Sequence, residues 1–346
     1  MRVLFDIVHP ADVLFFLGPM RHLIARADVV DIVSREKDVA CDLLDQFGLP
    51  HRPLSRAGNG RVGLASELVR RDWALLRHVR MNRPEVMIGF GGVAIAHVGR
   101  MLNIPAISFY AADTASLQTR LTWPFITHLY VPESYAGPVP PQRTTRFPGV
   151  KELSFFHPDN FQPDAAVALA SGWDPDRANY FIRTVSWRAN HDLGKSGWDD
   201  DTLMALIAKL AKRGKVHLSS ERLLPSEFAQ YHYTGAKSAV HHLMAHCDLY
   251  VGESATMAHE AAFLGVPAIY DGTDHPGTTR ELARHGLLSA LRQPGKDGLL
   301  AEVDAFLVDG VAACTRSRLV SYLAGRSNLT DYIVAALDRH AQKRVA

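Results

Sequence analysis

The residues best suited to chemistry lie in one short segment, residues 248–271. Its apolar start stops at Gly252, as a buried parallel strand does, and an Ala-rich helical stretch follows. Ser254 and Thr256 are N-cap residue types, and the free N–H groups and dipole of a helix N-terminus favour phosphate. Glu260 lies one helical turn after Thr256, so its carboxylate can accept hydrogen bonds from paired ribose hydroxyls on the same face. The segment therefore predicts a nucleotide site formed by Ser254, Ala255, Thr256, Met257 and Glu260.

The same segment also carries the signals that end such a helix. Gly265 occupies the expected C-terminal position, Pro267 prevents continuation, and residues 268–270 open another apolar strand. An ordinary strand–helix–strand unit with a solvated Glu260 fits these residues as well. The nucleotide interpretation is favoured because the small residues, the cap and the carboxylate occur together.

Two other strand ends in the second half of the chain carry polar residues. A strand over residues 179–182 leads to Arg183 and Ser186, and a strand over residues 216–219 leads to Glu221. A guanidinium can hold a diphosphate through two parallel hydrogen bonds, which a lysine ammonium does less well. Arg183, Ser186 and Glu221 are therefore added to the predicted nucleotide site.

Acid–base candidates follow strands in the first half. His9 and Asp12 come after a strand over residues 3–8, and Asp113 comes after a strand over residues 104–110. Imidazole has the pKa nearest neutrality, whereas Asp113 lies in a segment without obvious cap spacing and is the strongest general-base candidate. His9 is equally well explained as a strand-end histidine bonded to backbone, and Asp12 as a helix cap. Both alternatives stay open.

The elements that must position these residues alternate between strand and helix. Apolar strands and helical stretches follow one another in both halves, which predicts parallel, doubly wound sheets. In such sheets ligands meet the loops at the carboxyl ends of the strands, where the candidate residues lie. The fold class is therefore α/β, with two Rossmann-like domains expected to face each other across a cleft.

The chain length of 346 residues indicates two domains. A stretch rich in proline and glycine, residues 138–149, is expected to link them. The expected divisions are an N-terminal domain over residues 1–148 for the acceptor and a C-terminal domain over residues 149–326 for the nucleotide. An amphipathic helix within residues 327–346 is expected to pack back on the N-terminal domain.

Composition excludes several classes of protein. Net charge is only +2, so nothing in the whole chain favours nucleic-acid binding. The three cysteines, Cys41, Cys247 and Cys314, lie far apart, which indicates reduced thiols and a cytoplasmic protein. The early Asp6 argues against a signal peptide, and no apolar run approaches membrane-spanning length.

Residues 61–84 predict a helix that carries both apolar residues and many arginines. A basic amphipathic helix can rest on an anionic membrane surface, which would place the protein peripherally at the inner membrane face. The favoured interpretation is a core-facing helix with a solvated basic face. Peripheral membrane contact through this helix is kept as the alternative.

Two clusters that resemble metal sites are better explained by helices. The three aspartates at residues 199–201 precede a helix over residues 202–212 and complement its dipole. His241, His242 and His246 have no patterned cysteine or acidic partner and fit a short helix. No acid-X-acid pair follows a strand, so no metal or other cofactor is expected.

The arrangement resembles the GT-B fold of glycosyltransferases and of non-hydrolysing UDP-N-acetylglucosamine 2-epimerases. The segment GESATMAHEAAFLGVPAI in the second half carries this resemblance. More closely, DIVHPADVLFF, DTASLQTRLTWPF and RFPGVKE, together with that segment, resemble a poorly characterised GT-B-like family of unknown function. The resemblance covers residue 1 to about residue 290. It implies that Glu260 binds the nucleotide ribose, that Ser254, Ala255 and Thr256 form the phosphate-binding turn, and that Arg183 lies near the diphosphate.

Two departures count against the epimerases. That family has an acid directly after the glycine of the strand at residues 86–89, where this chain has Phe90, Gly91 and Gly92. It also has a glutamate in the next strand-end loop, where this chain has Asp113. An epimerase that eliminates and re-adds UDP needs acids on both sides of the sugar, and one of them is missing here.

We therefore expect a GT-B glycosyltransferase that moves a sugar from a nucleotide diphosphate sugar to an acceptor. UDP is the expected nucleotide. The acceptor is not identified, and a lipid-linked molecule and a polysaccharide are the candidates. Arg183 and the helix dipole would neutralise the donor without an obligatory metal. The alternatives are a UDP-sugar 2-epimerase and a non-catalytic nucleotide-sugar-binding protein.

Overall fold

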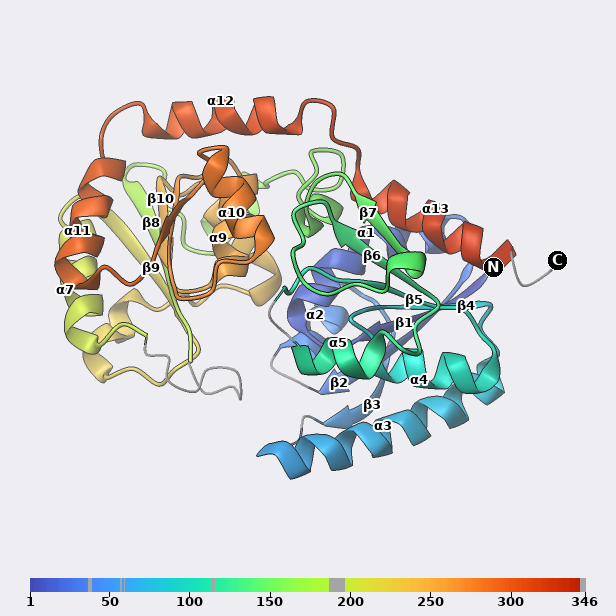
Figure 1. Ribbon diagram of the computed structural model, residues 1–346. Helices are drawn as coiled ribbons and strands as arrows, with labels where there is room; N and C mark the ends of the chain where they lie inside the picture. The colour runs from blue at the N-terminus through green and yellow to red at the C-terminus, as the bar shows by residue number, and fades with distance from the viewer. Residues whose placement is uncertain (37–38, 57, 59, 114–115, 187–196, 343–346) are drawn as a thin grey trace. The chain divides into compact units, whose positions relative to one another are not determined.

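The computed structural model describes residues 1–36, 39–56, 58, 60–113, 116–186 and 197–342. The chain forms two compact units (Figure 1). Unit 1 comprises Met1–Asn160 and Ser327–Ala346, and unit 2 comprises Phe161–Arg326. Residues 149–160, expected in the second domain, thus belong to unit 1. None of the helices in the described ranges combines the length and the apolar content needed to cross a membrane.

Unit 1 is built on a parallel sheet whose described strands run in the order β3-β2-β1-β4-β5-β6-β7. The strands are β1 (Arg2–Ile7), β2 (Val29–Glu36), β3 (Arg52–Arg56), β4 (Val86–Phe90), β5 (Ala106–Phe109), β6 (His128–Pro132) and β7 (Thr144–Phe147). Direct pairing of β1 with β4 reverses the winding of the sheet between these two strands. This is the Rossmann-like strand order, and its switch point lies between β1 and β4.

Helices cover both faces of the unit 1 sheet (Figure 1). One group consists of α1 (Pro10–Ala25), α2 (Ala40–Gln46) and α13 (Leu329–Gln342), with the 3₁₀ turn η2 (Lys151–Ser154) against α1. The other group consists of α3 (Gly60–Asn82), α4 (Val93–Leu102) and α5 (Ser116–Thr122). A further 3₁₀ turn, η1, spans Pro141–Arg143. The C-terminal helix α13 packs against α1, and the Tyr130 hydroxyl lies 3.1 Å from Nε2 of His340 on that helix.

Unit 2 has a second parallel sheet, with described strands in the order β12-β11-β10-β8-β9. These are β8 (Ala178–Thr184), β9 (Gly214–Ser220), β10 (Leu249–Gly252), β11 (Ala268–Asp271) and β12 (Ser289–Leu291). Its helices are α6 (Ala165–Ala170), α7 (Asp200–Ala211), α8 (Val240–Met244), α9 (Ala255–Phe263), α10 (Gly277–Arg284), α11 (Gly295–Phe306) and α12 (Val311–Leu323), with 3₁₀ turns η3 (Ser226–Tyr231) and η4 (Lys237–Ala239). The winding reverses between β8 and β10.

The α/β class and the parallel sheets predicted from the alternation of strands and helices are confirmed. Three short strands were not predicted: β3, β7 and β12. β7 lies inside the stretch expected to be a linker, and residues 138–149 are therefore part of unit 1 rather than a connection between the units. Only Phe147 of this edge strand is buried, so its sequence carries too few apolar residues to signal a strand.

Candidate functional site

The switch point of unit 2 gathers most of the predicted nucleotide residues. The register pairs Arg183 of β8 with Gly252 of β10, and the N–H of Glu253 donates to the carbonyl of Arg183 at 2.9 Å. Helix α9 begins directly after β10, so its N-terminus lies at the carboxyl end of the sheet beside β8. In doubly wound sheets, the crevice at the carboxyl ends of the strands on either side of such a switch is the usual place for a ligand.

The turn between β10 and α9 has the predicted geometry. Ser254 is the N-cap of α9, and its hydroxyl accepts a hydrogen bond from the N–H of Met257 at 3.3 Å. The four residues Ser254, Ala255, Thr256 and Met257 are all half-buried, so the helix N-terminus is within reach of a ligand. Gly265 ends the helix with φ of +74°, as predicted.

Arg183 is already engaged by its neighbours in unit 2. Its Nη1 donates to the hydroxyl of Ser219 at 2.6 Å, and its Nη2 forms an ion pair with Glu221. The second carboxylate oxygen of Glu221 accepts the N–H of Ser186 at 3.3 Å. Glu221 is the more exposed partner, so a diphosphate that takes the Nη2 group would displace this carboxylate. The structure thus brings Arg183, Ser186 and Glu221 together at the ends of β8 and β9.

Glu260 is buried, with 6% of its surface exposed, and faces a histidine. Its Oε2 lies 3.0 Å from Nε2 of His241 on α8. Thr256, one turn earlier, remains half-buried. The predicted ribose contact and the contact with His241 therefore use the same carboxylate. The sequence does not reveal this partner, because His241 lies on a different helix.

Glu253 lies at the same strand end and is a candidate site residue that sequence reasoning missed. It is buried at the end of β10, and its two carboxylate oxygens accept the N–H groups of Val185 at 3.2 Å and Trp198 at 2.7 Å. The Trp198 indole donates to buried Asp271 at the end of β11. Both acids directly follow or end a short apolar strand, which is the signal that could have identified them.

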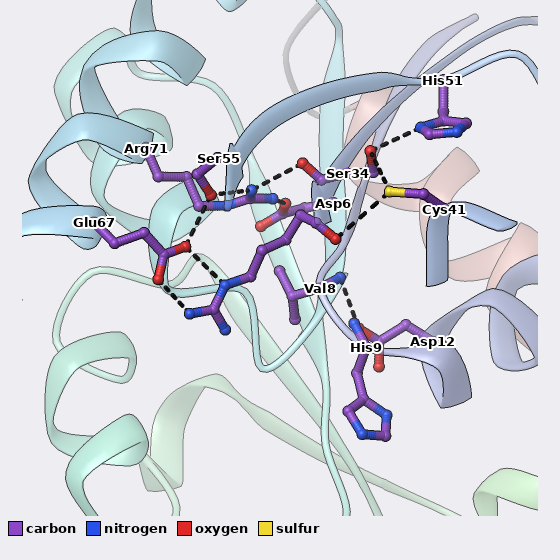
Figure 2. Close-up of polar contacts among 11 residues, drawn as sticks. Asp6, Val8, His9, Asp12, Ser34, Cys41, His51, Ser55, Glu67 and Arg71 are labelled. Carbon is purple, nitrogen blue, oxygen red and sulfur yellow. Dashed lines mark hydrogen bonds and ion pairs between the residues drawn. The ribbon is translucent and has the colours of Figure 1, made fainter. Parts of the chain in front are cut away.

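In unit 1, His9 and Asp12 form a capping box at the start of α1 (Figure 2). Nδ1 of His9 accepts the N–H of Ala11 at 3.2 Å, while Oδ2 of Asp12 accepts the N–H groups of His9 and Val8 at 2.9 and 3.0 Å. Because Nδ1 is the acceptor, a neutral His9 carries its proton on Nε2. Its Nδ1 can act as a base only by releasing the cap.

The pKa of buried Asp12 is raised to about 7, mainly because burial disfavours its charge, with the nearby Asp6 adding to the effect. The folded state therefore holds a proton that the unfolded state loses from about pH 3.8 upward. We expect the free energy of unfolding to fall as the pH rises from about 4 to about 7, by up to roughly 4 kcal/mol.

Asp12→Asn keeps an acceptor for the two N–H groups but does not titrate. We expect its stability to vary less over this window and to exceed that of the parent at about pH 8. Urea unfolding at a series of pH values measures both proteins. Identical pH profiles for the parent and the variant would contradict the assignment of this titration to Asp12.

Asp113 is half-buried beyond the carboxyl end of β5. Two buried tyrosines lie near it, since its charge contributes to the raised pKa of both Tyr110 and Tyr135. Burial is the larger cause and, with Asp113, raises the pKa of Tyr135 to about 12. Among the described residues nothing hydrogen-bonds to the Tyr135 hydroxyl. Asp113 thus combines partial access with two neighbouring phenol groups, of which that of Tyr110 donates to Gln118.

Beside the capping box, a buried charged cluster was not anticipated (Figure 2). Asp6 on β1 pairs with Arg71 on α3, and Arg71 also donates to the Ser34 carbonyl and the Ser55 hydroxyl at 3.0 and 3.1 Å. Next to it, Glu67 accepts bonds from the Arg35 guanidinium, the Ser55 hydroxyl and the N–H of Gly58. Although burial opposes it, these contacts lower the pKa of Glu67. The cluster ties α3 to the carboxyl ends of β1, β2 and β3.

The helix explanations for the two metal-like clusters are confirmed. Asp199 caps α7 by accepting the N–H of Thr202 at 2.7 Å, and Asp200 and Asp201 lie in the first turn. His241 and His242 lie on the short helix α8. Within the described ranges, no group of three or more His, Cys, Asp or Glu side chains is arranged to hold a metal ion.

Comparison with known proteins supports the fold. Residues 1–279 match the model of a family described as "Protein of unknown function (DUF354)". No curated protein matches the chain in sequence. Among solved structures, the UDP-GlcNAc 2-epimerase of Neisseria meningitidis bound to UDP-GlcNAc has a TM-score of 0.65 at 13% identity, covering 98% of this chain and 100% of that chain.

Two further solved structures are transferases. The spinosyn rhamnosyltransferase SpnG complexed with thymidine diphosphate has a TM-score of 0.68 at 15% identity, covering 98% of this chain and 100% of that chain. The spinosyn forosaminyltransferase SpnP has a TM-score of 0.68 at 14% identity, covering 99% of each. At these identities the similarity concerns the fold, and the expected GT-B fold with two Rossmann-like domains is confirmed.

Proposed function

We propose that this chain, which belongs to the DUF354 family, is a glycosyltransferase that moves a sugar from a nucleotide diphosphate sugar to an acceptor hydroxyl. A UDP-linked donor is the first candidate. The thymidine diphosphate bound to SpnG in a similar fold makes other bases worth testing. The proposal concerns the reaction class and leaves the identity of the sugar and acceptor to experiment.

One observation carries the proposal. At the switch point of unit 2, a capped helix N-terminus, a guanidinium and a buried carboxylate lie on neighbouring elements of one sheet edge. A helix N-terminus and a guanidinium both attract a diphosphate, and a carboxylate accepts bonds from vicinal hydroxyls. Together these three groups suit the diphosphate and the ribose of a nucleoside diphosphate.

The donor would be held by unit 2. We assign the diphosphate to the N-terminus of α9, at Ser254 through Met257, and to Arg183 after its exchange with Glu221. Glu260 would accept the ribose hydroxyls, and Ser186 and Glu221 would border the nucleotide. The positive charge of Arg183 and the helix dipole would neutralise the departing diphosphate, so no metal is needed.

The acceptor would be served by unit 1. Asp113 would remove the proton of the acceptor hydroxyl, whose oxygen attacks the anomeric carbon as the bond to the diphosphate breaks and the nucleoside diphosphate leaves. His9 would orient the acceptor, or would take the proton at Nδ1 after releasing its cap. Asp12 holds this loop in place through two backbone N–H groups.

Incubation with UDP- and TDP-sugars in the presence of EDTA tests the proposal. Release of the nucleoside diphosphate, by transfer or slow hydrolysis, is the expected result. A new sugar nucleotide without release would support a 2-epimerase instead, and binding without turnover would support a non-catalytic protein. Complete loss of activity in EDTA that Mg²⁺ restores would contradict the metal-free account.

The epimerase alternative is disfavoured by the loop after β4. Gly91 and Gly92 adopt φ of +82° and +58°, and a side chain at Gly91 would collide with Gln118. Positive φ strains any residue that has a Cβ. Positive φ therefore disfavours an acid at Gly91 and Gly92, and the residue directly after Gly89 is Phe90 rather than an acid.

A prediction on Glu260 separates nucleotide binding from packing. Because one carboxylate serves both contacts, Glu260→Gln is expected to weaken nucleoside diphosphate binding by about tenfold or more, as the loss of a charged acceptor costs roughly 1.5–3 kcal/mol. Isothermal titration calorimetry with UDP and TDP measures this effect.

The matched control is His241→Asn, which removes the internal partner of Glu260 but keeps the carboxylate. We expect its nucleotide affinity to stay within about threefold of the parent, even if its thermal stability falls. Equal affinity of Glu260→Gln and the parent would show that the carboxylate serves only His241.

A further inference from the structure

Helix α3 presents one face to solvent along its whole length, on the outside of unit 1 (Figure 1). Its opposite face is buried through Arg71, Leu75 and Val79 and packs against α4 and β3. Gly60, Leu64 and Ala65 are also exposed in the first turns, but eight exposed positions fall, at about 100° per residue, on a single face roughly 120° wide. They are Val62, Ser66, Val69, Arg70, Trp73, Arg77, Arg80 and Met81.

The apolar side chains of this face are strongly exposed to solvent. Val62, Val69 and Trp73 expose 84%, 70% and 60% of their surface. They lie at helical spacing along the same side, and Met81 continues the apolar stripe towards the C-terminus at 68% exposure. Apolar side chains that gather on one face, with a tryptophan among them, mark an interaction surface rather than scattered exposed residues.

The charged members of the face all have one sign. Arg70, Arg77 and Arg80 are exposed, and none of their guanidinium groups pairs with another group in the described part of the chain. The two acids of α3 are turned away from solvent: Glu67 is buried against Arg35, and Asp72 is half-buried against His97. The face is therefore both apolar and basic, with no acid to neutralise it.

We propose that this face of α3, defined by the eight residues above, binds an anionic phospholipid bilayer. Tryptophan and valine can insert at the level of the headgroups while the arginines contact lipid phosphates, which is how an amphipathic basic helix lies on a membrane. Charge complementarity favours an anionic partner. The exposed apolar side chains among the arginines favour a bilayer over an acidic protein surface, because a bilayer also offers an apolar phase. The proposal is independent of the glycosyltransferase function.

Co-sedimentation of the full chain with vesicles, without any nucleotide, tests it. We expect binding to phosphatidylcholine vesicles that contain phosphatidylglycerol, weak binding to pure phosphatidylcholine, and a decrease with rising salt. Each arginine near an anionic surface contributes about fivefold, so the triple variant Arg70→Gln, Arg77→Gln, Arg80→Gln should bind roughly a hundredfold more weakly. Trp73→Ser should lower binding without changing its salt dependence.

The matched control removes three exposed arginines of unit 2 by Arg213→Gln, Arg284→Gln and Arg316→Gln. It lowers the net charge equally and should bind within about threefold of the parent. Equal losses in the two triple variants would overturn the proposal, since net charge alone would then explain binding. So would equal affinity for neutral vesicles, no vesicle binding by the parent, or binding to an RNA oligonucleotide that competes vesicles away.

Discussion

Asp113→Asn is expected to lower turnover by about 10²–10⁴-fold while leaving the dissociation constant for the nucleoside diphosphate nearly unchanged. The asparagine keeps the size of the side chain but cannot take a proton from the acceptor. It also has nearly the same shape as the aspartate, so the packing around Tyr110 and Tyr135 should be conserved. Steady-state release of the nucleoside diphosphate gives the turnover, and calorimetry gives the affinity.

His9→Ala is expected to reduce turnover in the same way, but it also removes the cap of α1. His9→Asn is the better variant, because asparagine is a good N-cap residue that lacks the imidazole. A rate loss in both variants with normal stability in His9→Asn assigns the effect to the ring. If Asp113→Asn and His9→Asn both keep turnover within a few-fold, the base lies elsewhere, Glu133 at the end of β6 is the next candidate, and the non-catalytic alternative gains support.

Arg71→Met is expected to destabilise unit 1 by about 3–5 kcal/mol. Asp6 and Arg71 expose only 1% and 4% of their surface, so removal of the guanidinium leaves a buried carboxylate without its counter-charge. The Ser34 carbonyl would lose its Arg71 donor and the Ser55 hydroxyl a donor as well. Denaturant unfolding measures the loss, and hydrogen exchange at β1 locates it in unit 1.

The double variant Asp6→Leu, Arg71→Met is the matched control. Replacing both members of a buried ion pair by apolar residues is often nearly neutral, so the double variant should recover most of the stability lost by the single one. If Arg71→Met costs less than about 1 kcal/mol, the ion pair is not what holds α3 to the sheet. If the double variant is as unstable as the single one, the loss comes from the shape and contacts of the arginine rather than from the uncompensated charge.

The pattern of apolar residues predicted the α/β class and the positions of the long strands and helices. It also predicted the capped turn from Gly252 to Met257, because a strand end, a cap residue and a helical stretch are consecutive in the chain. Each of these features depends on residues that are adjacent in the chain, so it can be predicted from a single sequence. The apolar pattern did not predict the strands β3, β7 and β12, because each is short and half-exposed at or near a sheet edge.

The single charge inside the apolar strand of residues 3–8 did carry information. A buried aspartate requires a partner, and the helix over residues 61–84 contains several arginines, but sequence spacing alone does not select one of them. Folding buries Arg71 and leaves Arg70 exposed, since adjacent residues of a helix point about 100° apart. Burial of Arg71 therefore gives this basic helix an internal ion pair, while its other arginines, such as Arg70, remain on the exposed face.

The tertiary structure alone decided the distant partners of the candidate residues in unit 2. Arg183 bonds to Ser219 and Glu221, and Glu260 faces His241, whereas the capping box of His9 and Asp12 is local in sequence. The chemistry of a side chain is fixed by its type, which the sequence states directly. Its availability for a substrate depends on groups that lie tens of residues away in the chain and reach it only when parallel strands align their carboxyl ends at one edge of a sheet.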